Sequence, residues 1–291
     1  MSRLKATLDA LLDQHDRTRS IQRDPIRLPH RYVAPEDRAL AALFAATYAY
    51  GRVDLFLERL DRIAEVWDAH GGPSAFVRHS DPQTWRGLLG HLHYRWTRGD
   101  DLVLFHAALR GALAEHGELA AVFAGATVRD ALQHASEQIS HHASQWTAPL
   151  GLPSELTRGL RYFLPSPRGG SACKRSNLFL RWMVRPDDGV DLGLWTHLRP
   201  DQLIIPVDRH IQRITPLIGL VPRADGSWRS AVAITDALRA LDPDDPVRYD
   251  FALAHLGISD GCRASLVPPV CSPCPVRSLC QHGRNLPSET A

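Results

Sequence analysis

Lysine is almost absent from this sequence. Of its 34 lysine and arginine side chains, only Lys5 and Lys174 are lysines. An arginine cannot lose its proton in a protein, whereas a lysine amine can, and the neutral amine is a nucleophile. Lys5 lies in a terminal segment where any cation would serve. Lysine at position 174 therefore indicates a reactive amine or a phosphate-binding cation, unless it stands there by chance.

Long apolar runs and a strong net charge are also missing. No apolar stretch is long enough to span a bilayer, and the N-terminus has no hydrophobic signal-peptide core. We therefore expect a cytoplasmic protein without a membrane partner. The formal net charge of +2 is not that of a strongly basic nucleic-acid-binding chain, so any basic surface must be local.

The alternating patterns that predict β-strands are nearly absent as well. Apolar residues recur instead at the spacing of helices, and Gly and Pro clusters separate these segments. The sequence therefore predicts an all-α protein. We expect helices over residues 1–22, 36–50, 52–67, 101–116, 128–145, 154–164 and 171–184.

A glycine turn at 165–170 joins two of the expected helices. Gly169 and Gly170 permit positive φ angles, so the backbone amides of the turn, together with Ser171, can converge on one anion. A DNA phosphate fits such a site without base preference. Arg175 adds positive charge on the following helix, and we predict that these four residues contact DNA.

Lys174 falls in the first turn of the helix expected over 171–184. The positive end of the helix dipole opposes protonation of an amine placed there. That effect favours a nucleophile over a simple cation. The preceding cysteine, Cys173, is interpreted as a small packing residue.

Asp208 precedes apolar residues at helical spacing, so it lies at or near a helix start. Aspartate is a preferred N-cap, and most such residues do nothing more. An ionised aspartate at this position is also suited to stabilising a developing cation. Both roles remain open at this point.

Four cysteines crowd the C-terminal segment in the pattern Cys-x8-Cys-x2-Cys-x5-Cys, formed by Cys262, Cys271, Cys274 and Cys280. Four thiolates suit either tetrahedral zinc or an iron–sulfur cluster. Zinc sites of four cysteines usually contain two separate Cys-x-x-Cys pairs, and only one close pair exists here. The pattern therefore favours an iron–sulfur cluster over zinc.

Two further segments carry aromatic or imidazole groups. Residues 91–96 interleave them, and Tyr94, Arg95 and Trp96 can stack on a base or pair with phosphate. The alternative is a buried aromatic pair beside a surface arginine. His141 and His142 suggest a metal site, but adjacent residues point to different faces of a helix, and we interpret both as structural.

The segments 170–180, 206–210 and 262–280 occur in an order that resembles endonuclease III-like DNA glycosylases, members of the helix-hairpin-helix superfamily of base-excision repair enzymes. The chain as a whole also resembles a bacterial family of that superfamily. The resemblance implies that Lys174 attacks the sugar C1′ of a damaged nucleotide and that Asp208 supports the attack. It also implies that the four cysteines hold a [4Fe–4S] cluster.

The same resemblance implies an architecture and a partner. We expect two helical lobes with a DNA-binding cleft between them. One is a barrel over 35–200 that ends with the hairpin; the other combines 1–34 with 201–285, and 286–291 form a disordered tail. The partner would be double-stranded DNA with a damaged base or abasic site, bound by a monomer at the bacterial nucleoid. The activity would combine a glycosylase with an abasic-site lyase.

Three departures from the family pattern leave alternatives open. The hairpin is longer than usual, and an insert at 185–195 is interpreted as a surface loop rather than the lining of a distinct pocket. The usual wedge glutamine is not evident, and Tyr48 or Tyr50 is proposed in its place. The competing functions are a monofunctional glycosylase, a non-catalytic DNA damage-binding protein, and a zinc-stabilised interaction module.

Overall fold

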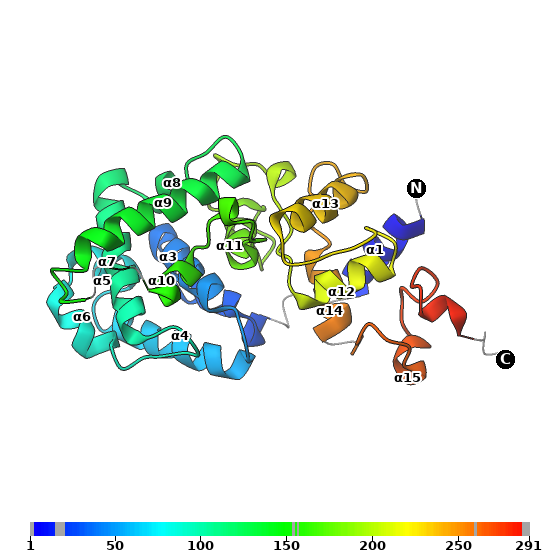
Figure 1. Ribbon diagram of the computed structural model, residues 1–291, viewed down its shortest axis with the longest axis horizontal. Coiled ribbons are helices and arrows are strands. Elements are labelled where there is room, and N and C mark those ends of the chain that lie inside the picture. Colours follow the sequence, from blue (N-terminus) through cyan, green and yellow to red (C-terminus); the bar gives the residue numbers. More distant parts are fainter. Residues whose placement is uncertain (1–2, 15–20, 153–154, 156, 259–260, 287–291) are drawn as a thin grey trace.

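The computed structural model describes residues 3–14, 21–152, 155, 157–258 and 261–286 (Figure 1). Within these ranges all regular structure is helical, and the two isolated backbone bridges are Tyr94 with Thr97 and Ser171 with Ser227. The predicted all-α fold is therefore confirmed. Apart from Leu286, the tail expected at 286–291 lies outside the described residues, as do 15–20 of the first expected helix.

One group of helices contains most of the chain before residue 185. Its members are α3 (Pro35–Tyr48), α4 (Val53–Asp68), α5 (Pro73–His79), α6 (Pro82–Leu89), α7 (Gly99–His116), α8 (Leu119–Val122), α9 (Val128–Trp146), α10 (Arg158–Phe163) and α11 (Lys174–Val184). The expected helices agree with these bounds to within a few residues, except for the one at 154–164. That helix begins only at Arg158, because Thr157 caps it by accepting a hydrogen bond from the amide of Leu160.

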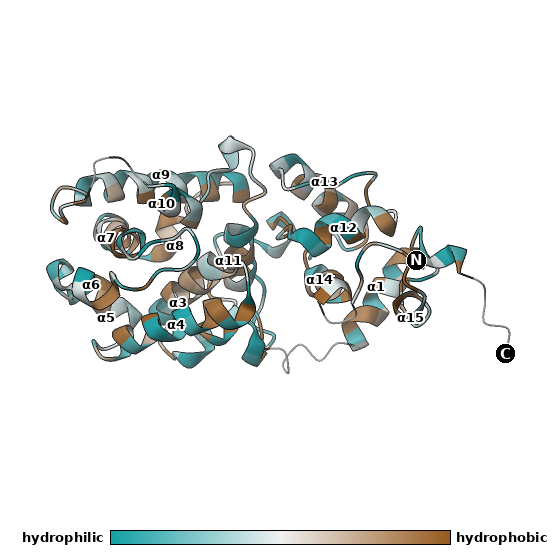
Figure 2. Ribbon diagram, turned by 60° about the horizontal axis from the view of Figure 1, so that its bottom comes forward, coloured by the Kyte–Doolittle hydropathy of each residue, from teal (hydrophilic) through white to brown (hydrophobic). Residues whose placement is uncertain are grey.

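A second group joins the N-terminal helix to the later part of the chain. It consists of α1 (Arg3–Gln14), α12 (Arg209–Leu217), α13 (Trp228–Arg239), α14 (Asp250–Ile258) and α15 (Pro268–Cys271). α1 packs against α14, and α12 packs against α14. Figures 1 and 2 show the same division from two directions, with α11 where the two groups meet.

The helix α3 supplies much of the core of the first group. Its buried residues include five alanines and the large side chains of Leu40, Leu43 and Phe44. Small side chains let a neighbouring helix approach closely, and α11 packs along α3. Since α11 begins at Lys174, this packing fixes the position of the lysine.

Both ends of α11 are set by the local backbone. Cys173 precedes the helix with φ of 47°, a left-handed conformation that is uncommon for a residue other than glycine. At the other end Arg185 is extended, as expected for the residue before Pro186. The helix is therefore bounded within 174–184.

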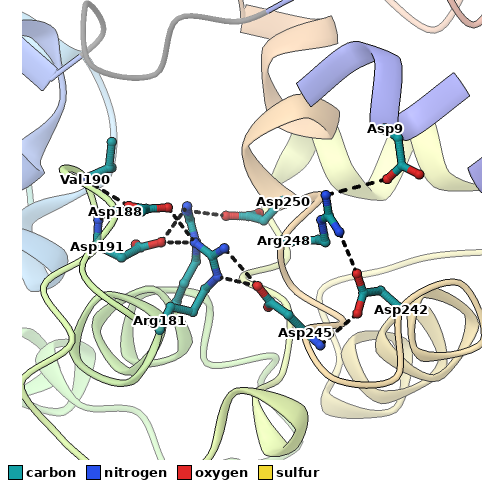
Figure 3. Close-up of polar contacts among 10 residues, drawn as sticks. Asp9, Arg181, Asp188, Val190, Asp191, Asp242, Asp245, Arg248 and Asp250 are labelled. Atoms are coloured by element: carbon teal, nitrogen blue, oxygen red, sulfur yellow. Dashed lines mark hydrogen bonds and ion pairs between the residues drawn. The ribbon is translucent and has the colours of Figure 1, made fainter. Parts of the chain in front are cut away.

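Two buried arginines, one on α11 and one just after it, connect this helix to the second group of helices (Figure 3). Arg181 donates to Asp250 of α14 at 2.9 Å and approaches Asp191 at 3.4 Å. Arg185, just past the end of α11, pairs with the same Asp191 and with Asp245. Asp191 has no exposed side-chain surface, so its charge depends on these two cations.

The insert at 185–195 is only partly a surface loop: residues 186–189 and 193 are exposed, as expected, whereas the expectation was wrong for its other half. Val190, Asp191, Leu192 and Trp195 are buried. The amide of Leu192 donates to the carbonyl of Trp182 at 2.7 Å, so the insert folds back along α11. Its burial is what brings Asp191 to the two arginines.

Replacement of Asp191 tests the importance of this ion network. Asp191→Ala should lower the free energy of unfolding by about 3–5 kcal/mol, because Arg181 and Arg185 would lose their shared partner in a buried site. The exposed pair of Arg199 and Asp201 provides the control, and Asp201→Ala should cost about 1 kcal/mol or less. Denaturant titration measures both, and equal losses would contradict the assignment.

Candidate functional site

Lys174 is the first residue of α11, and its side chain is partly buried. Its Nζ donates a hydrogen bond to the carbonyl oxygen of Ala49 at 3.2 Å. Ala49 is the C-cap residue of α3, so the amine joins the start of one core helix to the end of another. The predicted position in the first turn of the helix is confirmed.

Three carboxylates act on this amine from separate parts of the chain. They belong to Asp208 at the N-cap of α12, Asp250 at the first position of α14, and Asp24 before a short 3-10 helix. Burial nevertheless has the largest effect and lowers the pKa of Lys174 below its usual value. Asp208 and then Asp250 oppose this shift, and Arg175 adds to it.

Asp208 is held rigidly by the backbone. Its Oδ1 accepts hydrogen bonds from the amides of His210 at 2.7 Å and Ile211 at 2.8 Å, so it is the N-cap of α12. The capping role is therefore confirmed. Asp208 is also the carboxylate with the largest effect on the pKa of Lys174, so it acts on the amine while it caps the helix.

Asp24 and Asp250 were missed by the sequence analysis. Burial raises the pKa of both, that of Asp250 to about 6, with Arg181 acting in the opposite direction on each. Asp250 stands alone among apolar residues at the start of α14, and an acid in such a run needs a partner. That pattern was the available signal. Asp24, in a proline-rich connector, offered none.

The glycine turn does not present its amides as expected. The amides of Gly169 and Gly170 donate to Ser166 and Pro167, and that of Ala172 donates to Gly226 at 2.9 Å. The prediction that the Gly169 and Gly170 amides form an outward phosphate site is therefore wrong. Both glycines are exposed and Ser171 is half-buried, so the turn is still accessible at the surface.

Arg175 connects two segments inside the protein, and the prediction that it contacts DNA was wrong. The side chain is buried, and its guanidinium donates to the carbonyl oxygens of Thr47, at 2.7 Å, and Tyr162. It also lies 3.6 Å from the centre of the Tyr162 ring. Because the side chain is buried among these groups, it cannot reach a phosphate at the surface.

Of the predicted aromatic contacts, Trp96 is the exposed one, with 43% of its surface accessible. It stacks on the half-buried Tyr50 at 5.3 Å, and the guanidinium of Arg95 lies 4.6 Å from a Trp96 ring centre. Tyr48 and Tyr94 are buried, so neither can enter a DNA stack, and those two predictions were wrong.

The aromatic segment adjoins the lysine through the chain turn after α3. Gly51 has φ of 84°, and a side chain there would collide with the Tyr94 hydroxyl, at 2.3 Å from the added carbon. The Tyr94 hydroxyl donates to the carbonyl of Tyr50 at 2.6 Å. Tyr50 in this turn directly follows Ala49, whose carbonyl oxygen accepts the hydrogen bond from the Lys174 amine.

The four C-terminal cysteines line one cavity of about 470 Å³. Apolar side chains from α12 and α14 form its other wall, including Ile214, Leu217 and Leu256. Burial raises the pKa of Cys274, and the other three cysteines raise it further, so the four sulfur atoms interact. No three of these sulfur atoms lie within 4.8 Å of one another.

Cys173 lies apart from this cavity. It is buried, its sulfur donates to the carbonyl of Pro165 at 3.2 Å, and burial raises its pKa to about 12. The interpretation as a packing residue is confirmed.

None of the described helices has the length and apolar character needed to cross a membrane.

Residues 24–259 match a protein-family model described as "Protein of unknown function (DUF2400)". The chain belongs to this family. The DUF2400 match begins at Asp24, includes Lys174, Asp208 and Asp250, and ends before Cys262. No match was found among curated proteins.

The coupling between Asp208 and Lys174 can be measured by amine labelling. In a Lys5→Arg background Lys174 is the only lysine, and mass spectrometry can follow its modification as pH changes. Asp208→Asn should move the labelling midpoint to lower pH, because the carboxylate charge raises the pKa of Lys174. Asp81, the N-cap of α6, is the matched control, since Asp81→Asn changes a cap elsewhere. A midpoint that stays fixed or rises in Asp208→Asn would disprove the coupling.

Proposed function

We propose that this protein is a DNA base-excision repair glycosylase with abasic-site lyase activity, and that Lys174 is its nucleophile. The proposal rests on the lowered pKa and the partial exposure of the Lys174 amine. Burial lowers the pKa of Lys174, and the side chain keeps partial exposure beside the N-cap carboxylate of Asp208. A lysine with a lowered pKa is suited to covalent catalysis at neutral pH.

The proposed reaction begins with the damaged nucleotide flipped out of the duplex, because C1′ is shielded inside it. The neutral amine of Lys174 forms a bond to C1′ as the bond from C1′ to the base breaks, and the base leaves with its electron pair. Ring opening then gives a protonated Schiff base. Loss of a C2′ proton expels the 3′ phosphate by β-elimination, and water later hydrolyses the imine to release the amine.

Asp208 would support this reaction through its fixed charge. The sugar becomes cationic as the base departs, and a carboxylate held by two backbone amides needs no reorganisation to stabilise it. Asp250, which accepts a hydrogen bond from Arg181 at 2.9 Å, would add a second negative charge that acts on the amine.

DNA would lie across the surface where the two helix groups meet, which in this proposal are two lobes on either side of a binding cleft. The exposed contacts would come from the first helix group: Trp96 and Arg95, and the surface of the hairpin at Gly169, Gly170 and Ser171, without the amides of the two glycines. Trp96, supported from below by Tyr50, has a face on which a base can stack. The protein would act as a monomer in the cytoplasm, at the nucleoid.

We also propose that the C-terminal cavity holds a [4Fe–4S] cluster. The donors fit, because Cys262, Cys271, Cys274 and Cys280 line a single cavity with apolar walls. The cluster is proposed over zinc because the sequence has a single close pair, Cys271 with Cys274, where four-cysteine zinc sites usually have two. A cluster bound there would tie the C-terminal segment to α12 and α14.

Borohydride trapping tests the role of Lys174. Wild type should become covalently attached to abasic-site DNA when borohydride reduces the imine, and gel electrophoresis detects the product. Lys174→Arg should give no product, because arginine keeps the charge and loses the nucleophile. Lys5→Arg is the matched control and should trap as wild type does, since these are the two lysines of the chain.

The same experiment separates the competing functions. A wild-type protein that cleaves a damaged base and never traps would be a monofunctional glycosylase. Binding of abasic DNA with neither reaction would favour a non-catalytic damage-binding protein, and Lys174 would then be a cation.

Metal analysis tests the cluster. Aerobically purified protein should be yellow-brown and contain iron and sulfide. Cys271→Ser should lower both, whereas Cys173→Ser, which changes a cysteine outside the cavity, should keep them. A colourless protein that contains zinc in place of iron would overturn the assignment.

A further inference from the structure

A second group of metal-ligating side chains lies where α7 ends against α9. Glu115 and His116 occupy the last turn of α7, and His142 lies on α9. One ligand atom from each of the three residues lies within 4.8 Å of the other two. The helices α7 and α9 pack along each other, so this arrangement is held by the core.

The imidazole nitrogens in this cluster lack ordinary partners. His142 is 4% exposed, and within the described part of the chain neither ring nitrogen makes a well-aligned hydrogen bond, although its Nε2 atom lies 3.1 Å from a carboxylate oxygen of Glu115. The Nε2 atom of His116 is buried and equally without one. Buried polar atoms are nearly always hydrogen-bonded or bound to a ligand, so these nitrogens require an explanation.

The distances around Glu115 suit a metal ion. Its carboxylate oxygens lie 3.1 Å from Nε2 of His142 and 3.8 Å from Nε2 of His116. Ligand atoms about 2.0–2.1 Å from a tetrahedral zinc ion lie about 3.4 Å apart. The two measured separations fall on either side of that value.

Gly111 makes room for the buried imidazole. It lies on α7 one turn before Glu115, and a side-chain carbon there would stand 2.6 Å from Nδ1 of His142. Glycine weakens a helix interior, so its presence here has a reason in the position of the ring. The site is therefore built by three features of the sequence: two ligands on one helix, one on the next, and a gap between them.

We propose that Glu115, His116 and His142 bind a divalent transition metal ion of the zinc type. Two imidazoles and one carboxylate are three ligands, and they leave the fourth tetrahedral position for water or another ligand. His142 is thus separated in role from His141, which is exposed on the other face of α9. The ion would fasten the end of α7 to α9.

The experiment measures zinc bound by the full chain after incubation with Zn²⁺ and gel filtration. Glu115→Gln and His116→Gln should each bind one equivalent fewer than wild type. His141→Gln, the adjacent histidine, should bind as wild type does. The C-terminal cysteines can also bind zinc, so Cys271→Ser is measured in parallel. The zinc lost in Cys271→Ser and the zinc lost in Glu115→Gln should add in the double variant.

Two further readouts decide the result. Zn²⁺ should raise the melting temperature of Cys271→Ser and fail to do so when Glu115→Gln is added. In Cys271→Ser, Co²⁺ should give an absorption spectrum of nitrogen and oxygen ligation that disappears with Glu115→Gln. Equal zinc content in wild type, Glu115→Gln and His116→Gln would overturn the site and leave an ordinary contact between Glu115 and His142. Glu115 is exposed, so its variant tests the site even if His116→Gln does not fold.

Discussion

The burial of two arginines on one side of a helix is the interaction on which the rest of this structure depends. Arg181 on α11 and Arg185 just after it are buried where the two groups of helices meet, and their charges require carboxylate partners there. Asp250 comes from the second group and Asp191 from the insert. Satisfying the arginines therefore fixes α14 relative to α11, and with it the distance from Lys174 to the acids that surround it.

The low polarity of the same region affects Lys174 differently from Arg181. Arg181 has direct carboxylate partners, whereas Lys174 donates a hydrogen bond to a backbone carbonyl and interacts with its carboxylates only at longer range. Burial therefore prevails and lowers the pKa of the amine. One region of low polarity thus holds an arginine and a lysine seven residues apart on α11, and only the lysine amine can lose its proton there.

Much of this arrangement was available from the sequence, and the rest was not for identifiable reasons. Helical periodicity located α3, α7, α9 and α11, and a helix-start pattern located Asp208 as a cap, since both signals are local. The meeting of Asp24 and Asp250 at Lys174 depends on three distant segments. Tyr48 and Arg175 were taken as surface contacts because a pattern of aromatic and basic residues does not reveal which side chains the core has already engaged.

The buried insert has a consequence for how such a chain can change over time. Segments between helices normally tolerate deletion, since they lie on the surface. Here a deletion of 186–195 would remove Asp191 and leave Arg181 and Arg185 without their shared buried partner, while neutral replacements at 181 and 185 would leave the acid buried without a cation. Neither half is dispensable alone. Asp191 of the insert and the two arginines therefore depend on each other, so a change in one requires a matching change in the others.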